Sequence, residues 1–201
     1  DFLYANLSYF GYIAGQKFND GLWDVVEPTG PNKNPYRCGF LQFIAVARDD
    51  AEAEKLYSGP ATYFYSRCLH TYPGFGNPPG YTSIPTMRAG IESMVARSTR
   101  RQDVENLTWK EMITRGYVVA GSPESVRQQL EVLTDKMHVG HLMVLAQYGD
   151  MSKEVTMYNT TLFAKEVMPK LRYKFSEYED KWWPSTGLDK IAEPAPLTAL
   201  V

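Results

Sequence analysis

Cysteines and long apolar runs are scarce in this sequence, and neither sign of charge dominates. The two cysteines, Cys38 and Cys68, are too few for a disulfide scaffold or a four-ligand zinc site. The longest strongly apolar run, Leu142 to Ala146, is much shorter than the roughly 20 residues that span a bilayer. The 21 basic and 23 acidic residues lack the basic excess of a general nucleic-acid binder. We therefore expect a soluble protein without membrane or nucleic-acid partners.

Motifs for nucleotide binding, serine hydrolysis and secretion are also missing. No Gly-x-Gly-x-x-Gly, Walker loop or Gly-x-Ser-x-Gly elbow occurs. His138 and His141 have no third ligand at metal spacing, so we expect no metal site. The chain starts with Asp1 rather than methionine and shows no signal peptide. We expect a cytoplasmic protein that is a processed chain, a subunit or a fragment.

The clearest element runs from Cys38 to Val46 and is almost continuously apolar. This pattern predicts a strand that is covered on both faces, as in a parallel sheet. Gln42 interrupts it, either as an amide satisfied inside the core or as a polar group facing a pocket. Asp49 or Asp50 then caps a helix, which makes a strand–helix unit.

Three other segments show local patterns. Near the start, Tyr9 to Ala14 favours a short strand and Leu22 to Glu27 favours one or two helical turns. Four prolines between His70 and Pro85 predict a long loop, which is either a covering segment or a wandering surface loop. Thr108 and Glu111 form a capping box that predicts a short helix to Arg115.

From residue 117 onward, strand and helix patterns alternate. Tyr117 to Ala120 predicts a strand, and Ser122 then caps a helix that Gly140 ends. One apolar stripe marks this helix, formed by Val126, Leu130, Leu133 and Met137. Leu142 to Ala146 predicts a second strand, and Ser152 begins a helix that Pro169 ends or kinks. This order is the parallel βαβ pattern, and the tail after residue 171 should wrap over a surface.

Four stretches together resemble the C-terminal half of the bacterial luciferase-like flavin monooxygenases. They are Tyr36-Arg37-Cys38-Gly39-Phe40-Leu41-Gln42 leading into residues 45–53, Val119-Ala120-Gly121-Ser122-Pro123-Glu124-Ser125-Val126, residues 141–151, and Leu162-Phe163-Ala164-Lys165-Glu166-Val167-Met168-Pro169. Each stretch is weak alone, but their order and spacing over residues 36–171, about two thirds of the chain, make the resemblance fairly specific.

The resemblance implies an α/β fold of the (β/α)8 TIM-barrel type. Residues 1–171 would supply the C-terminal part of the barrel, with an insertion over about 70–108 and an extended tail over 172–201. A complete barrel needs roughly 250 residues. The resemblance therefore implies that a missing N-terminal half or a partner chain, in a homo- or hetero-oligomer such as a dimer, completes the flavin site.

The resemblance also implies a flavin-dependent monooxygenase. Reduced FMN, or F420 in a deazaflavin branch, would react with O2, and a C4a-hydroperoxide would oxygenate a small organic substrate. A flavin reductase is a further expected partner. Two alternatives stay open: a non-catalytic barrel subunit or fragment that acts through a partner interface, and a different α/β barrel enzyme.

Candidate cofactor contacts follow from the ends of the predicted strands, where barrel enzymes place their sites. These residues are Gly121 and Ser122 after one strand, and Gln147 and Tyr148 after the next. The N–H groups over residues 121–124 begin a helix, which attracts a flavin phosphate or serves as an ordinary cap.

Further candidates lie in the insertion over about 70–108. His70 is the candidate catalytic residue, because its ring can hydrogen-bond a substrate or a peroxyflavin oxygen; a purely structural role is the alternative. Tyr72, Phe75 and Arg88 are candidates for a lid over the substrate.

Overall fold

A computed structural model describes residues 3–7, 11–26, 33–68, 84, 88 and 107–182. Its strands are β1 (Tyr4–Asn6), β2 (Cys38–Val46), β3 (Val118–Gly121) and β4 (His141–Leu145). Its α-helices are α1 (Gly11–Val26), α2 (Asp50–Tyr63), α5 (Trp109–Thr114), α6 (Pro123–Met137), α7 (Lys153–Leu162) and α8 (Met168–Leu171). A 3-10 turn, η1 (Pro35–Arg37), precedes β2, and the π-helical turns η2 (Phe64–Cys68) and η3 (Phe163–Val167) continue α2 and α7.

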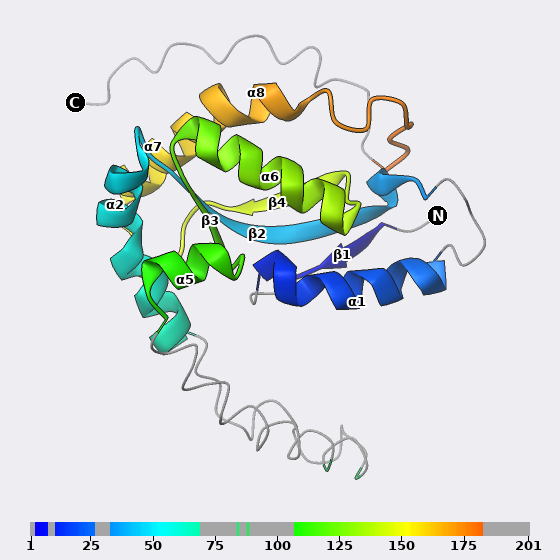
Figure 1. The fold of residues 1–201 in the computed structure, drawn as a ribbon, viewed down its shortest axis with the longest axis horizontal. Coiled ribbons are helices and arrows are strands. Elements are labelled where there is room, and N and C mark those ends of the chain that lie inside the picture. The colour runs from blue at the N-terminus through cyan, green and yellow to red at the C-terminus, as the bar shows by residue number, and fades with distance from the viewer. Residues whose placement is uncertain are drawn as a thin grey trace.

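Strand β2 is the centre of the sheet (Figure 1). It pairs in parallel with β1 along Cys38–Phe40, with β3 along Phe43–Val46 and with β4 along Gly39–Phe43. The parallel α/β prediction is confirmed at this level. The closed eight-stranded barrel is not present among the described residues, whose four strands form an open sheet. Four strands are too few to close on themselves around a filled interior.

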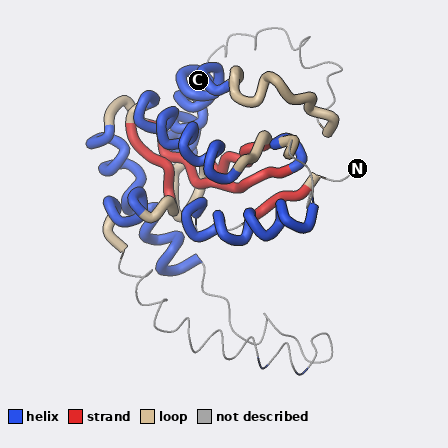
Figure 2. The backbone as a smooth tube through the Cα atoms, turned by 45° about the vertical axis from the view of Figure 1, so that its right-hand side comes forward, coloured by secondary structure: helices blue, strands red, loops and turns tan. Residues whose placement is uncertain are grey.

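Helices cover both faces of β2, as the continuously apolar sequence predicts (Figure 2). Phe43 and Ala45 point into a cluster with residues of α2 and α5. Phe40 and Ile44 point into a second cluster with α1, α6 and η3. All four side chains are at most 2% exposed, so β2 lies in the core of the described part. Burial of both faces accounts for a strand with almost no polar positions.

The two predictions for the first 36 residues have different outcomes: the helical turns predicted from Leu22 are confirmed as the end of α1, and the strand predicted over Tyr9 to Ala14 is wrong. The strand lies at Tyr4–Asn6, and a helix runs from Gly11 to Val26 where Tyr9 to Ala14 favoured a strand. Gly11 and Gly15 lie inside this helix because they allow it to pack closely against other parts of the chain. A Cβ on Gly11, at φ 74°, would lie 2.1 Å from the Gly116 carbonyl oxygen, and one on Gly15 would lie 3.1 Å from the Phe40 ring.

The ends of several helices differ from the prediction in detail. Helix α6 ends at Met137, where His138 takes a left-handed conformation at φ 49°, rather than at Gly140. Pro169 does not end its helix, because α8 continues through it after the π-helical turn. The capping box of Thr108 and Glu111 is confirmed at the start of α5.

The described part of the tail, residues 172–182, runs along α6 and η1. Tyr173 donates to Glu131 at 2.6 Å, and the Asn34 amide donates to the Glu179 carbonyl at 2.9 Å. These contacts agree with a segment that wraps over a surface. None of the described helices combines the length and apolar character needed to cross a bilayer.

Candidate functional site

The carboxyl ends of β2, β3 and β4 lie at one end of the sheet, because the strands are parallel. The Ala47 N–H donates to the Gly121 carbonyl at 3.0 Å, which joins the ends of β2 and β3. Asn159 of α7, fully buried, joins the ends of β2 and β4. Its amide donates to the carbonyls of Ile44 at 2.7 Å and Ala146 at 2.9 Å, and its oxygen accepts from the Val46 N–H at 2.7 Å.

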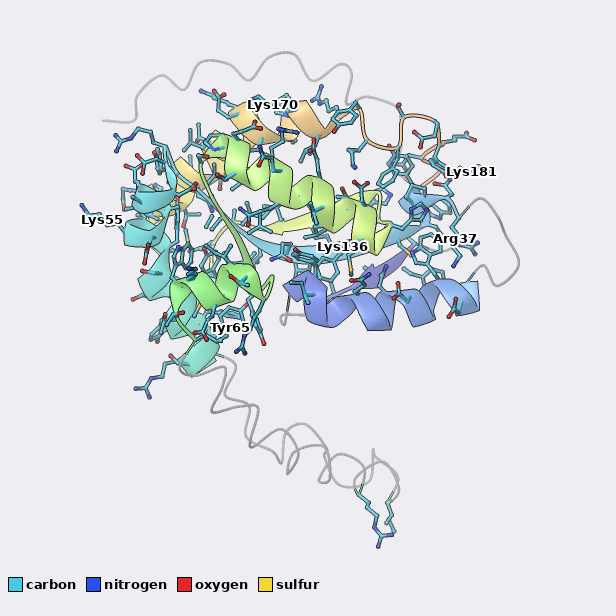
Figure 3. The ribbon with its side chains drawn as sticks, in the orientation of Figure 1. Arg37, Lys55, Tyr65, Lys136, Lys170 and Lys181 are labelled. Atoms are coloured by element: carbon cyan, nitrogen blue, oxygen red, sulfur yellow. The ribbon has the colours of Figure 1, made fainter. Side chains whose placement is uncertain are left out.

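Aromatic rings fill the space between these strand ends and α2. The Phe43 ring lies 5.2 Å from Tyr148, 4.8 Å from Phe64 and 5.8 Å from Tyr65. Tyr57 of α2 belongs to the same cluster. Figure 3 marks Tyr65 where α2 continues into η2. We call Phe43, Tyr57, Phe64, Tyr65 and Tyr148 the aromatic cluster.

The three hydroxyl groups of the aromatic cluster differ in whether they have a hydrogen-bond partner. Tyr57 donates to the Val46 carbonyl at 2.7 Å, and Tyr65 donates to the Tyr117 carbonyl at 3.2 Å. The Tyr148 hydroxyl is buried and has no hydrogen-bond partner among the described residues. Burial raises the pKa of all three phenols, so each is neutral at ordinary pH.

A tight turn after β4 seats Tyr148 in the aromatic cluster. Gly149 has φ 60°, and a Cβ there would lie 2.1 Å from the Pro60 carbonyl oxygen of α2. The turn therefore packs directly on α2 and directs the Tyr148 ring inward, edge-on to Phe43 at 77°. Gln147, its neighbour, is exposed. The two candidates after β4 thus face different surroundings.

The start of α6 is closed by a carboxylate of this chain. Asp50 accepts from the Ser122 N–H at 2.7 Å and from the Ser125 hydroxyl at 3.3 Å. The Ser122 hydroxyl in turn accepts from the Ser125 N–H at 3.2 Å. A Cβ on Gly121, at φ 133°, would lie 2.4 Å from Asp50 Oδ1. Asp50 thus occupies the position where these N–H groups would hold an anion.

This geometry supports the interpretation of Ser122 as an ordinary cap. A phosphate at α6 would have to displace Asp50, and contact of Gly121 and Ser122 with a flavin stays a prediction. The cap of α2 is Asp49, which accepts from the Glu52 N–H at 2.8 Å. Asp50 is therefore free to face α6.

The fold resembles solved structures of monooxygenases, although no protein-family model and no curated protein matches the chain. Monooxygenase RslO1 from Streptomyces bottropensis is 14% identical, with a TM-score of 0.48 over 83% of this chain and 41% of that one. The oxygenating constituent of 3,6-diketocamphane monooxygenase from Pseudomonas putida is a type II Baeyer-Villiger monooxygenase solved with FMN. It is 17% identical, with a TM-score of 0.53 over 83% of this chain and 42% of that one.

The similarity is one of fold, and it supports the resemblance inferred from the sequence at that level. The chain spans about two fifths of the length of these structures. That share agrees with an open sheet of four strands in the described part.

A cleft of about 450 Å³ lies beside the start of α6, between α2 and α5. Asp50, Glu54, Trp109, Lys110 and Gln129 are among its lining residues. Gln129 is already paired, since its amide donates to the Ala120 carbonyl at 2.7 Å. Within the described ranges, no three His, Cys, Asp or Glu side chains gather to hold a metal ion.

The described residues do not test most of the remaining sequence candidates. His70, Tyr72 and Phe75 lie outside the described residues, and Arg88 is described as exposed. Gln42 is fully buried and donates to the Tyr117 carbonyl at 3.0 Å and the Gly116 carbonyl at 3.2 Å. Of its two interpretations, the amide inside the core fits this arrangement.

Sequence reasoning missed Asp50, Tyr57, Tyr65 and Asn159 as residues of this end of the sheet. A partial signal existed for Asp50, because only one of two adjacent aspartates can cap α2. Tyr57 and Tyr65 are eight residues apart along one helical segment, but tyrosines at that spacing also suit an ordinary core. Asn159 carried no signal, since its partners are backbone groups of distant strands.

Proposed function

We propose that the chain is part of a flavin-dependent monooxygenase that uses reduced FMN and O2 on a small organic substrate. The observation that carries this proposal is the fold similarity, at a TM-score of 0.53, to an oxygenating constituent solved with FMN. The carboxyl ends of the strands, where α/β enzymes bind ligands, also carry a buried hydroxyl without a partner at Tyr148. F420 is the alternative cofactor, and a flavin reductase is a proposed partner.

The chain's residues fit one part of a flavin better than another. When bound, the flavin supplies the oxygen chemistry, and the protein supplies orientation and a dry site. The neutral Tyr148 hydroxyl suits a polar edge of the ring, and the surrounding aromatic side chains exclude water. The start of α6 does not suit the phosphate, because Asp50 and Glu124 place negative charge there. We propose that the phosphate is held elsewhere in the protein.

The proposal requires more protein than the described sheet supplies. The five residues of β4 are only partly buried, and among the described strands β4 pairs with β2 alone. Their apolar sequence suits a strand that receives further cover. We propose that a missing N-terminal half or a partner chain provides this cover and the rest of the flavin site.

Titration of the purified protein, with any chain that co-purifies, tests the proposal. FMN, riboflavin and F420 are each added, in oxidised form and reduced without oxygen, and binding is followed by fluorescence. We expect saturable binding of a flavin. Because the phosphate is not read at α6, residues of this chain alone should distinguish FMN from riboflavin poorly. Absence of flavin binding in every assembly would contradict the proposal.

A non-catalytic subunit is the second candidate, and the position of Asp50 favours it. A carboxylate that fills the start of α6 is expected in a scaffold that has lost anion binding. This candidate predicts a stable complex with a partner chain and no flavin on this chain in the same titration.

A further inference from the structure

In the described part of the chain, the Tyr148 hydroxyl is a buried polar group at this end of the sheet without a hydrogen-bond partner. Tyr148 is 4% exposed, and its oxygen has no hydrogen-bond partner. Tyr57 and Tyr65, in the same aromatic cluster, both donate to backbone carbonyls. A buried hydroxyl without a partner destabilises the folded state, because it loses its hydrogen bonds to water. Such a group in a folded protein calls for an explanation.

Packing explains the ring of Tyr148 but not its oxygen. The edge-on contact with Phe43 at 5.2 Å uses the ring alone, and phenylalanine would make it equally well. The oxygen therefore needs a partner that the described residues do not provide. Tyr148 follows the carboxyl end of β4, where open α/β sheets bind their ligands.

We propose that the Tyr148 hydroxyl donates a hydrogen bond to a carbonyl oxygen of a bound ring-shaped ligand. This inference rests on the flavin monooxygenase function proposed above. The carbonyl belongs either to the flavin ring or to a ketone substrate, and both offer the same acceptor.

The surroundings select a neutral, ring-shaped ligand. Phe43 lies edge-on to Tyr148, and Tyr57 and Tyr65 belong to the same buried core, where burial keeps both phenols neutral. A phosphate or carboxylate would lack a counter-charge there, whereas a carbonyl group requires only one donor. Rings stack well against aromatic side chains.

A π-helical turn supplies part of the wall around this hydroxyl. Phe64 and Tyr65 belong to η2, which continues α2 after Pro60. Turns of this type are rare and often mark functional sites. We place the movement that admits the ligand in η2, since the opposite wall is the sheet itself.

The test compares Tyr148→Phe with Tyr57→Phe in the full protein as purified. Both changes remove one buried hydroxyl from the aromatic cluster and keep the ring. Three probes are titrated: FMN, the bicyclic ketone camphor, and camphane, which has the same skeleton without the carbonyl. Thermal unfolding without ligand gives the second readout.

We expect the two variants to separate in both readouts. Tyr148→Phe should leave Tm unchanged or raise it by about 2–4 °C, because it removes an unsatisfied group. It should weaken binding of one carbonyl probe about tenfold and leave camphane binding unchanged. Tyr57→Phe should lower Tm by a similar amount, because the Val46 carbonyl loses its donor, and should leave affinities unchanged.

The probes identify the source of the carbonyl and separate this inference from the proposed function. Weakened FMN binding assigns the contact to the flavin, and weakened camphor binding with unchanged FMN binding assigns it to the substrate. A wild-type protein that binds no flavin, yet loses camphor affinity in Tyr148→Phe, contradicts the proposed function and supports the inference. Equal affinities in wild type and Tyr148→Phe, or no binding of either carbonyl probe, overturn the inference.

Discussion

The turns that follow β3 and β4 lie at the same end of one sheet but leave their polar groups in opposite states. After β3, the Ser122 N–H and the Ser125 hydroxyl are both taken by Asp50. After β4, the Tyr148 hydroxyl is buried without a partner. The first turn is complete within the chain, and its residues serve stability. The second turn leaves the Tyr148 hydroxyl without a partner in the described part. A ligand that accepts a hydrogen bond from this hydroxyl therefore gains more binding free energy here than at the first turn.

The largest effect should come from the residue that holds the ends of β2 and β4 together. Asn159→Leu keeps the volume but removes three buried hydrogen bonds. Since each unsatisfied buried group costs about 1–3 kcal/mol, we expect a loss of at least about 3 kcal/mol in the free energy of unfolding. Urea denaturation measures it. Met157→Leu, on the exposed face of α7, is the control and should change stability little; equal losses would contradict the role of Asn159.

The second effect tests how tightly the β3 turn is closed. Gly121→Ala places a Cβ 2.4 Å from Asp50 Oδ1 at a positive φ, so we expect about 2 kcal/mol of destabilisation in urea. Gly21→Ala is the matched control, because no atom lies within 4 Å of its Cβ inside α1. It should stabilise by about 0.5–1 kcal/mol. A tolerated alanine at 121 would show that the turn is looser than described.

A smaller effect should appear when the charge at the β3 turn is removed. Asp50→Asn keeps an oxygen that can accept from Ser122 but removes the negative charge facing α6. We expect the ratio of FMN to riboflavin affinity to rise no more than about twofold, because the phosphate is held elsewhere; a severalfold rise would place the phosphate at the start of α6. Asp49→Asn is the control, because it removes an equal charge one residue away and keeps the α2 cap. The ratio of FMN to riboflavin affinity should not change in this variant. The same rise in both variants would assign the effect to net charge.

The smallest effect concerns pH at the first turn of α6. The hydrogen bond from Arg127 lowers the pKa of Glu124 to about 2, from the usual 4.5. Because the folded pKa is the lower one, the pair stabilises the fold above about pH 4.5 and ceases to do so as pH falls toward 2. Glu124→Gln should therefore reduce the drop in urea midpoint between pH 7 and pH 3. Glu124 is exposed and Arg127 partly exposed, so the change should be small, and an unchanged drop would exclude the pair as a contributor.

Local patterns predicted the elements around this site better than the contacts within it. The double-sided apolar run of β2, the stripe of α6 and the capping box at Thr108 depend on neighbours in sequence, and each was recognised. Only the end of α1 was predicted, because Gly11 and Gly15 make its first half a poor helix by local pattern. Their actual role depends on Gly116 and Phe40, which lie far away in the chain.

The candidate site was predictable as a location but not as chemistry. The rule that sites follow parallel strands selected Ser122 and Tyr148 together. It could not separate them, because their difference depends on Asp50, Tyr57 and Tyr65, which approach only in the folded chain. The sequence also did not predict that β4 pairs with β2, since an apolar strand can pair with any parallel partner.

The side-chain amide of Asn159 hydrogen-bonds backbone groups at the ends of β2 and β4, as the backbone of an adjoining strand would. A helix side chain here completes a backbone ladder, with one acceptor and two donated bonds spaced by the strands themselves. A slide of α7 by a single residue, about 1.5 Å, would break all three bonds at once. Helix α7 is therefore held in register with β2 and β4 at this end of the molecule, and Tyr158 of α7 also donates to Glu52 of α2 at 2.8 Å.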